Sequence, residues 1–150
     1  MYDMKALYQA ESVQDAVAPG GPSGCPDHRW RIRRAGADAG GKRAGVELIS
    51  IYGLDELRGV TLEADGTLRI GSLTSFSHIT RDPLIQQYLR VLGEAVDQVG
   101  GPQIRNTGTI GGNICNGATS ADSASTMWTL EAVAVLEGPE GERRVPVCEF

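Results

Sequence analysis

The chain has 150 residues, of which 41% are hydrophobic and 22% charged, a composition typical of one soluble globular domain. Its formal net charge of -5 excludes the basic surface that nucleic acid or an anionic membrane requires. No apolar run is long enough to span a membrane and the start is no signal peptide, so we expect a cytoplasmic protein without nucleic-acid or membrane partners.

The first half of the chain combines well-marked elements with one aberrant stretch. Ser12, with Asp15 three residues later, predicts a helix start. Residues 18–41 are rich in Gly, Pro and Arg and follow neither a helical nor a strand period. Order returns with a predicted strand at 46–50, and two alternating segments around Ala64-Asp65-Gly66 then predict a hairpin of strands 59–62 and 67–71.

The remaining segments predict helices and one strand pair. Thr74 is expected to cap a short helix, and Asp82-Pro83 starts a longer helix that reaches Val99. Its apolar stripe is a candidate core: Leu84, Ile85, Tyr88, Leu89, Leu92, Val96 and Val99. A loop at 102–121, a helix from Asp122 through Leu130 and strands 132–136 and 143–147 are expected to follow. Because no regular βαβ alternation is present, we expect an α+β fold and not a doubly wound sheet.

The glycine-rich segment at 100–117 has residues suited to holding an anionic ligand. Glycines allow close backbone approach, and neighbouring N–H groups can converge on an anionic oxygen. Thr109 and Asn113 add side-chain donors suited to pyrophosphate or ribityl hydroxyls. A tight turn without any ligand explains the glycines about as well, because the segment is neither a GxGxxG motif nor a Walker loop.

The segment Arg105-Asn-Thr-Gly-Thr-Ile-Gly-Gly-Asn113, followed by Thr119-Ser-Ala-Asp122, resembles the second FAD loop of a known family. That family comprises the FAD-binding subunits of xanthine dehydrogenase, carbon monoxide dehydrogenase and related molybdenum hydroxylases. The resemblance extends over residues 1–17 and 46–150. It implies an α+β FAD-binding domain of the xanthine dehydrogenase medium-subunit (PCMH-like) type, incomplete. Residues 1–150 would be its N-terminal part, without the rest of the domain and without the C-terminal domain.

The resemblance also implies roles for particular residues. Those that would contact the FAD phosphates and ribityl chain are Thr109, Ile110, Gly111, Gly112 and Asn113. Asp122 would hydrogen-bond the nucleotide, or cap the next helix, or do both. Arg105 would hold the loop or meet a phosphate, and we favour the structural role. Because we expect the loop to be exposed in the empty protein, valine at Gly111 or Gly112 should reduce FAD retention more than folding.

By the same resemblance, the chain is an oxidoreductase subunit that passes electrons from 2Fe–2S clusters through FAD to NAD. The molybdenum cofactor and the clusters would lie on partner subunits. This agrees with the three widely spaced cysteines, which form no CxxC pair and are expected to be buried thiols. No catalytic side chain and no metal ligand are predicted here, since the flavin does the redox chemistry. The fragment alone is expected to be inactive, and the alternative is a remnant or anion-binding module that cannot hold FAD.

The family also has an earlier phosphate loop, a Gly-Gly-Ser/Thr-Asp motif after a strand, whose place is taken here by the aberrant residues 18–41. Codons permitted for Arg29-Trp-Arg-Ile-Arg33, read one nucleotide later, encode Gly-Gly-Gly-Ser-Asp. We therefore expect a frameshifted stretch at 18–41 that removes one strand and one phosphate loop. A natural Gly/Arg-rich loop is the alternative, and it explains less.

Overall fold

The computed structural model describes residues 4–18, 46–117 and 121–150. Except for Ala18, the aberrant stretch at 18–41 lies outside these residues. The chain divides into two compact units, of which the first comprises Met1–Asp55 and Val135–Arg144 and the second Glu56–Ala134 and Val145–Phe150. None of the helices in the described ranges has the length and hydrophobicity that a membrane span needs.

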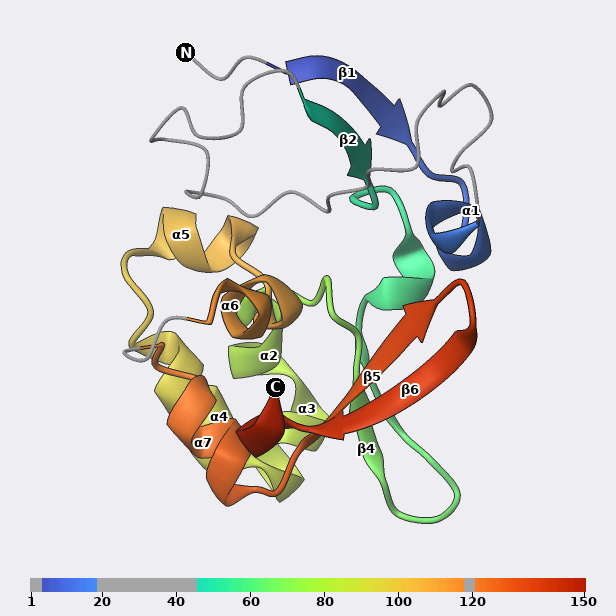
Figure 1. Cartoon of the computed structure of the whole chain (residues 1–150). Helices are drawn as coiled ribbons and strands as arrows, with labels where there is room; N and C mark the ends of the chain where they lie inside the picture. Colours follow the sequence, from blue (N-terminus) through green and yellow to red (C-terminus); the bar gives the residue numbers. More distant parts are fainter. Residues whose placement is uncertain (1–3, 19–45, 118–120) are drawn as a thin grey trace. The chain divides into compact units, whose positions relative to one another are not determined.

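The first unit contains the helix α1 (Val13–Val17) and two strands that pair in parallel, β1 (Met4–Gln9) and β2 (Val46–Ser50) (Figure 1). The predicted cap of α1 is confirmed, because the Ser12 hydroxyl accepts a hydrogen bond of 3.0 Å from the Asp15 N–H. The strand β2 also has its predicted bounds, whereas β1 is an element that the sequence analysis did not predict.

The second unit begins within a short 3-10 helix (Asp55–Leu57), which is followed by the predicted hairpin of β3 (Val60–Leu62) and β4 (Leu68–Ile70). The two strands are antiparallel, and the Asp65 carboxylate accepts a hydrogen bond of 2.9 Å from the Thr67 N–H in the turn. An aspartate that bonds a backbone N–H two residues on is a usual way to stabilise such a turn, so the hairpin prediction is confirmed together with its physical reason.

Three helices follow the hairpin: α2 (Phe76–Arg81), α3 (Pro83–Tyr88) and α4 (Arg90–Asp97). The predicted start of α3 is confirmed, because the Asp82 side chain accepts from the Leu84 and Ile85 N–H groups. The predicted cap of α2 is wrong, since Ser75 and not Thr74 accepts from the His78 N–H. Thr74 is instead buried, and its hydroxyl bonds both the N–H and the carbonyl of Gly59 in the hairpin.

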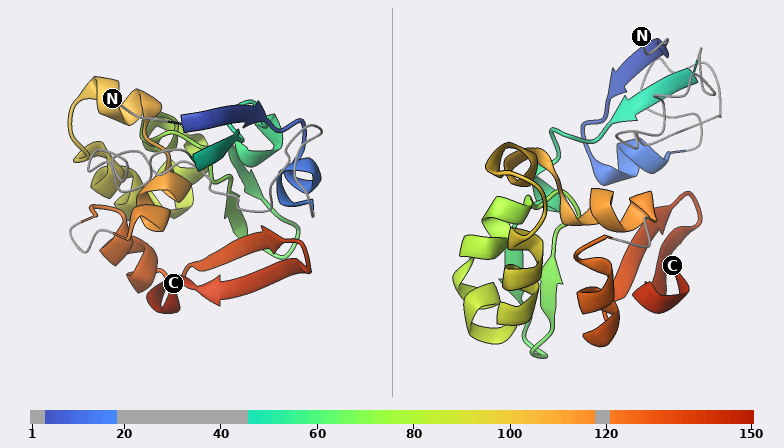
Figure 2. Two further views of the ribbon diagram at one scale, coloured as in Figure 1. Left: turned by 45° about the horizontal axis from the view of Figure 1, so that its top comes forward. Right: turned by 90° about the vertical axis from the view of Figure 1, so that its left-hand side faces the viewer.

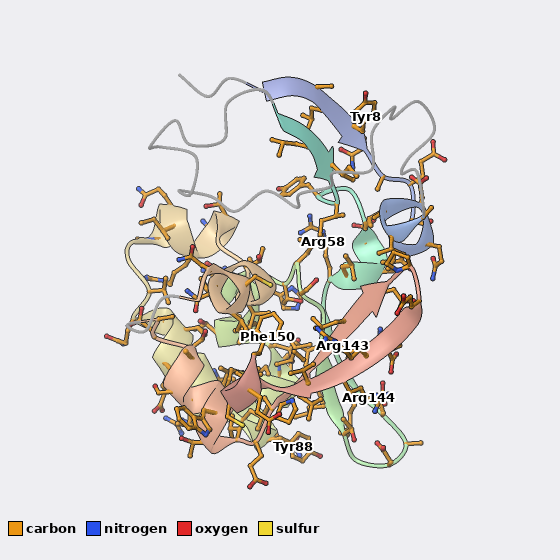
Figure 3. All side chains as sticks on the ribbon, viewed as in Figure 1. Tyr8, Arg58, Tyr88, Arg143, Arg144 and Phe150 are labelled. Carbon is orange, nitrogen blue, oxygen red and sulfur yellow. The ribbon has the colours of Figure 1, made fainter. Side chains whose placement is uncertain are left out.

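The predicted long helix from Pro83 to Val99 is broken at Leu89, which separates α3 from α4. The two helices have different neighbours, because α3 contacts strand β3 as well as α2, whereas α4 packs mainly against α2; Figure 2 gives two further views of the chain. Tyr88, at the end of α3 and labelled in Figure 3, is 52% exposed, whereas the stripe predicted that it would be buried.

The core of the second unit comes from α2, from the expected stripe and from the glycine-rich segment. Its members are Phe76, Ile79, Ile85, Leu92, Val96 and Ile110. Three stripe residues, Ile85, Leu92 and Val96, are completely buried. Each such side chain contributes about 1.5–3 kcal/mol by leaving water, so this cluster is the main apolar support of the second unit.

The segment expected to be a loop at 102–121 contains two helices, α5 (Pro102–Thr107) and α6 (Ile110–Asn116). The loop prediction is wrong, because it was based on the glycines and did not take the helix-start residues into account. Pro102 occupies the first turn of α5, and the Thr109 hydroxyl caps α6.

The rest of the chain agrees with its prediction. It consists of α7 (Ala124–Thr129), the strand pair β5 (Val133–Gly138) and β6 (Gly141–Pro146), and a last 3-10 helix (Val147–Glu149).

Candidate functional site

The predicted ligand loop lies against the segment that leads into α2. Ser75 and Thr109 form an antiparallel bridge, and the Phe76 N–H donates to the Gly108 carbonyl at 3.2 Å. Next to the bridge, the Ile110 N–H donates to the Thr74 carbonyl at 3.1 Å. These bonds join residues 74–76 to residues 108–110, which are more than thirty positions apart in the sequence, and they hold the start of α6 in place.

The N–H groups at the start of α6 all have acceptors inside the protein. The Gly111 N–H donates to the Ser72 carbonyl at 2.9 Å. The Gly112 N–H donates to the Thr109 hydroxyl at 3.2 Å, and the Asn113 N–H donates to the Thr109 carbonyl at 3.0 Å. The first N–H groups of a helix are the ones that normally bind an anion. The expected convergence of these N–H groups on an anionic oxygen is therefore not what the structure shows.

Gly111 and Gly112 have different surroundings. A Cβ on Gly111 would lie 2.7 Å from both the Cβ and the carbonyl oxygen of Ser72, so only glycine fits against that backbone. A Cβ on Gly112 would meet only the Thr109 hydroxyl oxygen, at 3.0 Å. Gly112 is also exposed, as expected for a ligand loop. The loop was expected to be exposed, but Gly111 packs against Ser72, so valine there should disturb folding as well as FAD retention.

Side chains are the groups that this region leaves available to a ligand. The Thr109 hydroxyl accepts from Gly112, and its own hydrogen has no acceptor among the described residues. The Asn113 amide oxygen is bonded, but its Nδ2 group makes no hydrogen bond within the described part of the chain. Since no buried side-chain nitrogen or oxygen there lacks a partner, Nδ2 must be reachable by solvent. The two side chains supply donors, which suits phosphate and hydroxyl oxygens.

Ile110 belongs to the protein core, although the motif predicted that it would contact the ligand. Its side chain is only 3% exposed and belongs to the core cluster, and its N–H is bonded to Thr74. The side chain of Ile110 therefore anchors α6, while its neighbours Thr109 and Asn113 carry the polar groups.

Asp122 lies in the turn before α7 and is exposed. The position before the first residue of α7 belongs to Ser123, so the expected cap by Asp122 is wrong. No hydrogen bond connects the Asp122 carboxylate to the described residues, which leaves it available as an acceptor for a ligand hydroxyl.

Ser123 is the residue that sequence reasoning missed. Its hydroxyl donates to the Asn113 amide oxygen at 2.5 Å, and its side chain is completely buried. The bond connects α6 with the turn that carries Asp122, so the two segments singled out in the sequence are brought together. No periodicity marks Ser123, and its position directly after Asp122 is the only signal that could have pointed to it.

Arg105 has the structural role that we favoured. Its guanidinium donates to the carbonyls of Val99 and Gly100 at 3.2 and 2.6 Å and lies 3.4 Å from an Asp97 carboxylate oxygen. These contacts tie α5 to the end of α4. Arg58 makes a comparable link, since its guanidinium reaches the Leu73 carbonyl at 3.4 Å in the strand-to-helix segment (Figure 3).

Two of the three cysteines differ from expectation, because Cys115 and Cys148 are exposed and not buried, while Cys25 lies outside the described residues. Cys115 is on α6, whose buried side is formed by Ile110 and not by the thiol. Within the described ranges no group of three or more His, Cys, Asp and Glu side chains converges as metal ligands do.

The sequence matches a family model described as the FAD binding domain in molybdopterin dehydrogenase, over residues 41–150. It is 48% identical over 103 residues to a xanthine dehydrogenase FAD-binding subunit of Escherichia coli, covering 69% of this chain and 35% of the relative. It is 42% identical over 103 residues to a nicotinate dehydrogenase FAD-subunit of Eubacterium barkeri, covering 69% of this chain and 34% of that one. The chain thus spans about a third of the length of these curated relatives.

The fold is similar to that of a solved carbon monoxide dehydrogenase from Hydrogenophaga pseudoflava, a form that lacks the Mo-pyranopterin moiety of its cofactor. The TM-score is 0.85 at 32% sequence identity, and the match covers 100% of this chain and 53% of that one. A quinoline 2-oxidoreductase from Pseudomonas putida has a similar fold, with a TM-score of 0.83 at 20% identity, over 100% of this chain and 53% of the other. The α+β architecture is therefore that of the solved chains, of which this one spans about half.

Proposed function

Since this chain belongs to the family of FAD-binding domains in molybdopterin dehydrogenases, we propose that it is part of the FAD-binding subunit of a xanthine dehydrogenase-like molybdenum hydroxylase. The observation that carries the proposal is the family match over residues 41–150, which contains both the 109–113 loop and Asp122. The two relatives named as FAD-binding subunits are 48% and 42% identical to this chain in the matched part.

In this proposal FAD is held by Thr109, Ile110, Gly111, Gly112 and Asn113 together with Asp122. The chemistry of the donor set supports it, because Thr109 and Asn113 have hydrogens to donate and Asp122 has a carboxylate to accept. A flavin nucleotide carries both kinds of partner, phosphate oxygens and ribityl or ribose hydroxyls. Ile110 and Gly111 would act mainly by shaping the loop, since their N–H groups are bonded to the 72–74 backbone.

When bound, the flavin would supply the redox chemistry that connects 2Fe–2S clusters of a partner subunit with an acceptor, for which we propose NAD. The protein's own residues would bind and orient the cofactor. A molybdenum-binding subunit and a 2Fe–2S subunit are the proposed partners, and a cytoplasmic location and a xanthine-type substrate belong to the same proposal.

The first experiment is to purify the protein made from its complete gene and record its absorption spectrum. We expect a flavin spectrum, FAD as the released nucleotide, and co-purification of two further subunits. Activity is then assayed with NAD and with an artificial dye as alternative acceptors. A complex that reduces only the dye would refute NAD as acceptor and leave the FAD assignment intact.

A colourless, folded protein that does not take up added FAD would refute the proposal. That result would favour the alternative, a remnant or anion-binding module that cannot hold FAD. A dehydrogenase that is fully active without any other subunit would contradict the proposed partners.

A further inference from the structure

Ser123 occupies the cap position of α7 without capping it. A serine there usually accepts a hydrogen bond from an N–H in the first turn, which stabilises the helix. The backbone of Ser123 has helical angles (φ -83°, ψ -22°), and its side chain makes no capping bond. The side chain is completely buried, and among the described residues its hydroxyl bonds only the Asn113 amide oxygen. The hydroxyl is therefore committed to Asn113 and not to its own helix.

This bond determines which way the Asn113 amide points. If the amide were turned around, Nδ2 would donate to the Ser123 oxygen, and the serine hydrogen would need another acceptor. Ser123 is 0% exposed, so water cannot reach it, and no other acceptor is available among the described residues. A buried donor without a partner is costly. The amide therefore keeps its oxygen towards Ser123 and leaves both Nδ2 hydrogens for another partner.

We propose that Ser123 is a positioning residue for the flavin nucleotide. Its buried hydroxyl holds Asn113 with Nδ2 presented to an oxygen of the ligand. The same bond keeps the neighbouring Asp122 beside α6, so that a donor and an acceptor are offered together. This role rests on the proposed FAD site, but it assigns to Ser123 no contact with the ligand. The effect passes through Asn113, and this makes it separable by experiment.

The test is a double-mutant cycle in the protein made from its complete gene, with FAD removed and then titrated back. Ser123→Ala should weaken FAD about three- to tenfold, the range for loss of one hydrogen bond. Asn113→Ala should weaken it at least as much. If Ser123 acts through Asn113, adding Ser123→Ala to Asn113→Ala should change the affinity no further. Ser125→Ala, an exposed serine of the same helix, is the matched control and should bind FAD normally.

Two more variants keep the test decisive. Ser123→Cys fills the same buried space with a weaker donor, and it replaces Ser123→Ala if that variant does not fold. Asn113→Asp keeps an acceptor for the Ser123 hydroxyl but removes the Nδ2 donors, so it should melt like the parent and lose FAD affinity.

The outcomes separate the two proposals. A parent protein that binds no FAD refutes the proposed function itself. The positioning role alone is refuted if the parent binds FAD, Asn113→Ala lowers the FAD affinity, and both Ser123 variants fold and bind FAD as tightly as the parent. If Ser123→Ala lowers the FAD affinity by the same factor with and without the Asn113 side chain, its effect is a general structural one. That result would also overturn the positioning role.

Discussion

Replacing Gly111 with alanine would place a methyl group where the backbone of Ser72 already lies. The new Cβ would be 2.7 Å from the Ser72 Cβ and carbonyl oxygen and 3.0 Å from its Cα, closer than such atoms approach. Either Ser72 or α6 must move, and the 2.9 Å bond from the Gly111 N–H to Ser72 would be strained. Overpacking destabilises a protein by about 1–3 kcal/mol, and the loss of a hydrogen bond by about 1 kcal/mol. The higher helix propensity of alanine offsets about 1 kcal/mol of this. The net loss should be about 1–3 kcal/mol.

Gly112→Ala is the matched control, one residue further along the same helix. Its Cβ meets only the end of the Thr109 side chain, at 3.0 Å. A gain of about 0.5–1 kcal/mol from helix propensity should offset a partly disturbed cap. The free energy of unfolding should therefore stay within about 1 kcal/mol of the parent.

The assay is thermal and urea unfolding of both variants in the cofactor-free protein, followed by circular dichroism. At roughly 2–4 °C per kcal/mol for a chain of this size, Gly111→Ala should melt roughly 2–12 °C lower. Equal melting temperatures for the two variants would refute the reasoning, because they would mean that the space beside Gly111 is not filled by Ser72.

Three further predictions concern groups around the loop and the gene itself. Asp122→Ala should weaken FAD by roughly 1–3 kcal/mol, with the melting temperature nearly unchanged because this side chain does not cap α7; a lower melting temperature with normal FAD affinity would contradict this. Arg105→Ala should lower stability by about 1–3 kcal/mol through its lost carbonyl bonds, and unchanged stability with lost FAD would instead indicate a phosphate contact. The gene read one base later over codons 18–41 should encode Gly-Gly-Gly-Ser-Asp, and stop codons there would end the frameshift hypothesis.

Local signals in the sequence were sufficient for most elements of the fold. Ser12, Asp65 and Asp82 each make the short-range hydrogen bond that their sequence context predicted. Such bonds involve residues two or three positions apart, so their partners can be read from the sequence itself. The α+β class followed from the order of these elements.

Long-range contacts explain the errors. Four glycines argued against helices at 102–117, since each lowers helix propensity by about 1 kcal/mol. The burial of Ile110 and the bonds from α6 to the 72–74 backbone outweigh that cost. The break at Leu89 likewise has no local marker, because it depends on what α3 and α4 pack against.

The members of the candidate site stay a prediction from the sequence, and their arrangement could not be predicted from it. The resemblance to known FAD loops identified 109–113 and Asp122 as one functional group. It could not reveal that the N–H groups of α6 have partners in the protein, or that the link between the two segments passes through Ser123. Both features depend on which distant residues meet in the folded chain.

The bonds from Ile110 and Gly111 to the 72–74 backbone have a consequence for binding kinetics. A glycine-rich loop free in solution must lose conformational entropy when a ligand arrives, at about 1–2 kcal/mol for each residue fixed. Here that entropy has been lost already during folding, so a nucleotide would meet a rigid surface. Preorganisation of this kind favours association in a single step, with a rate set by encounter and not by loop closure.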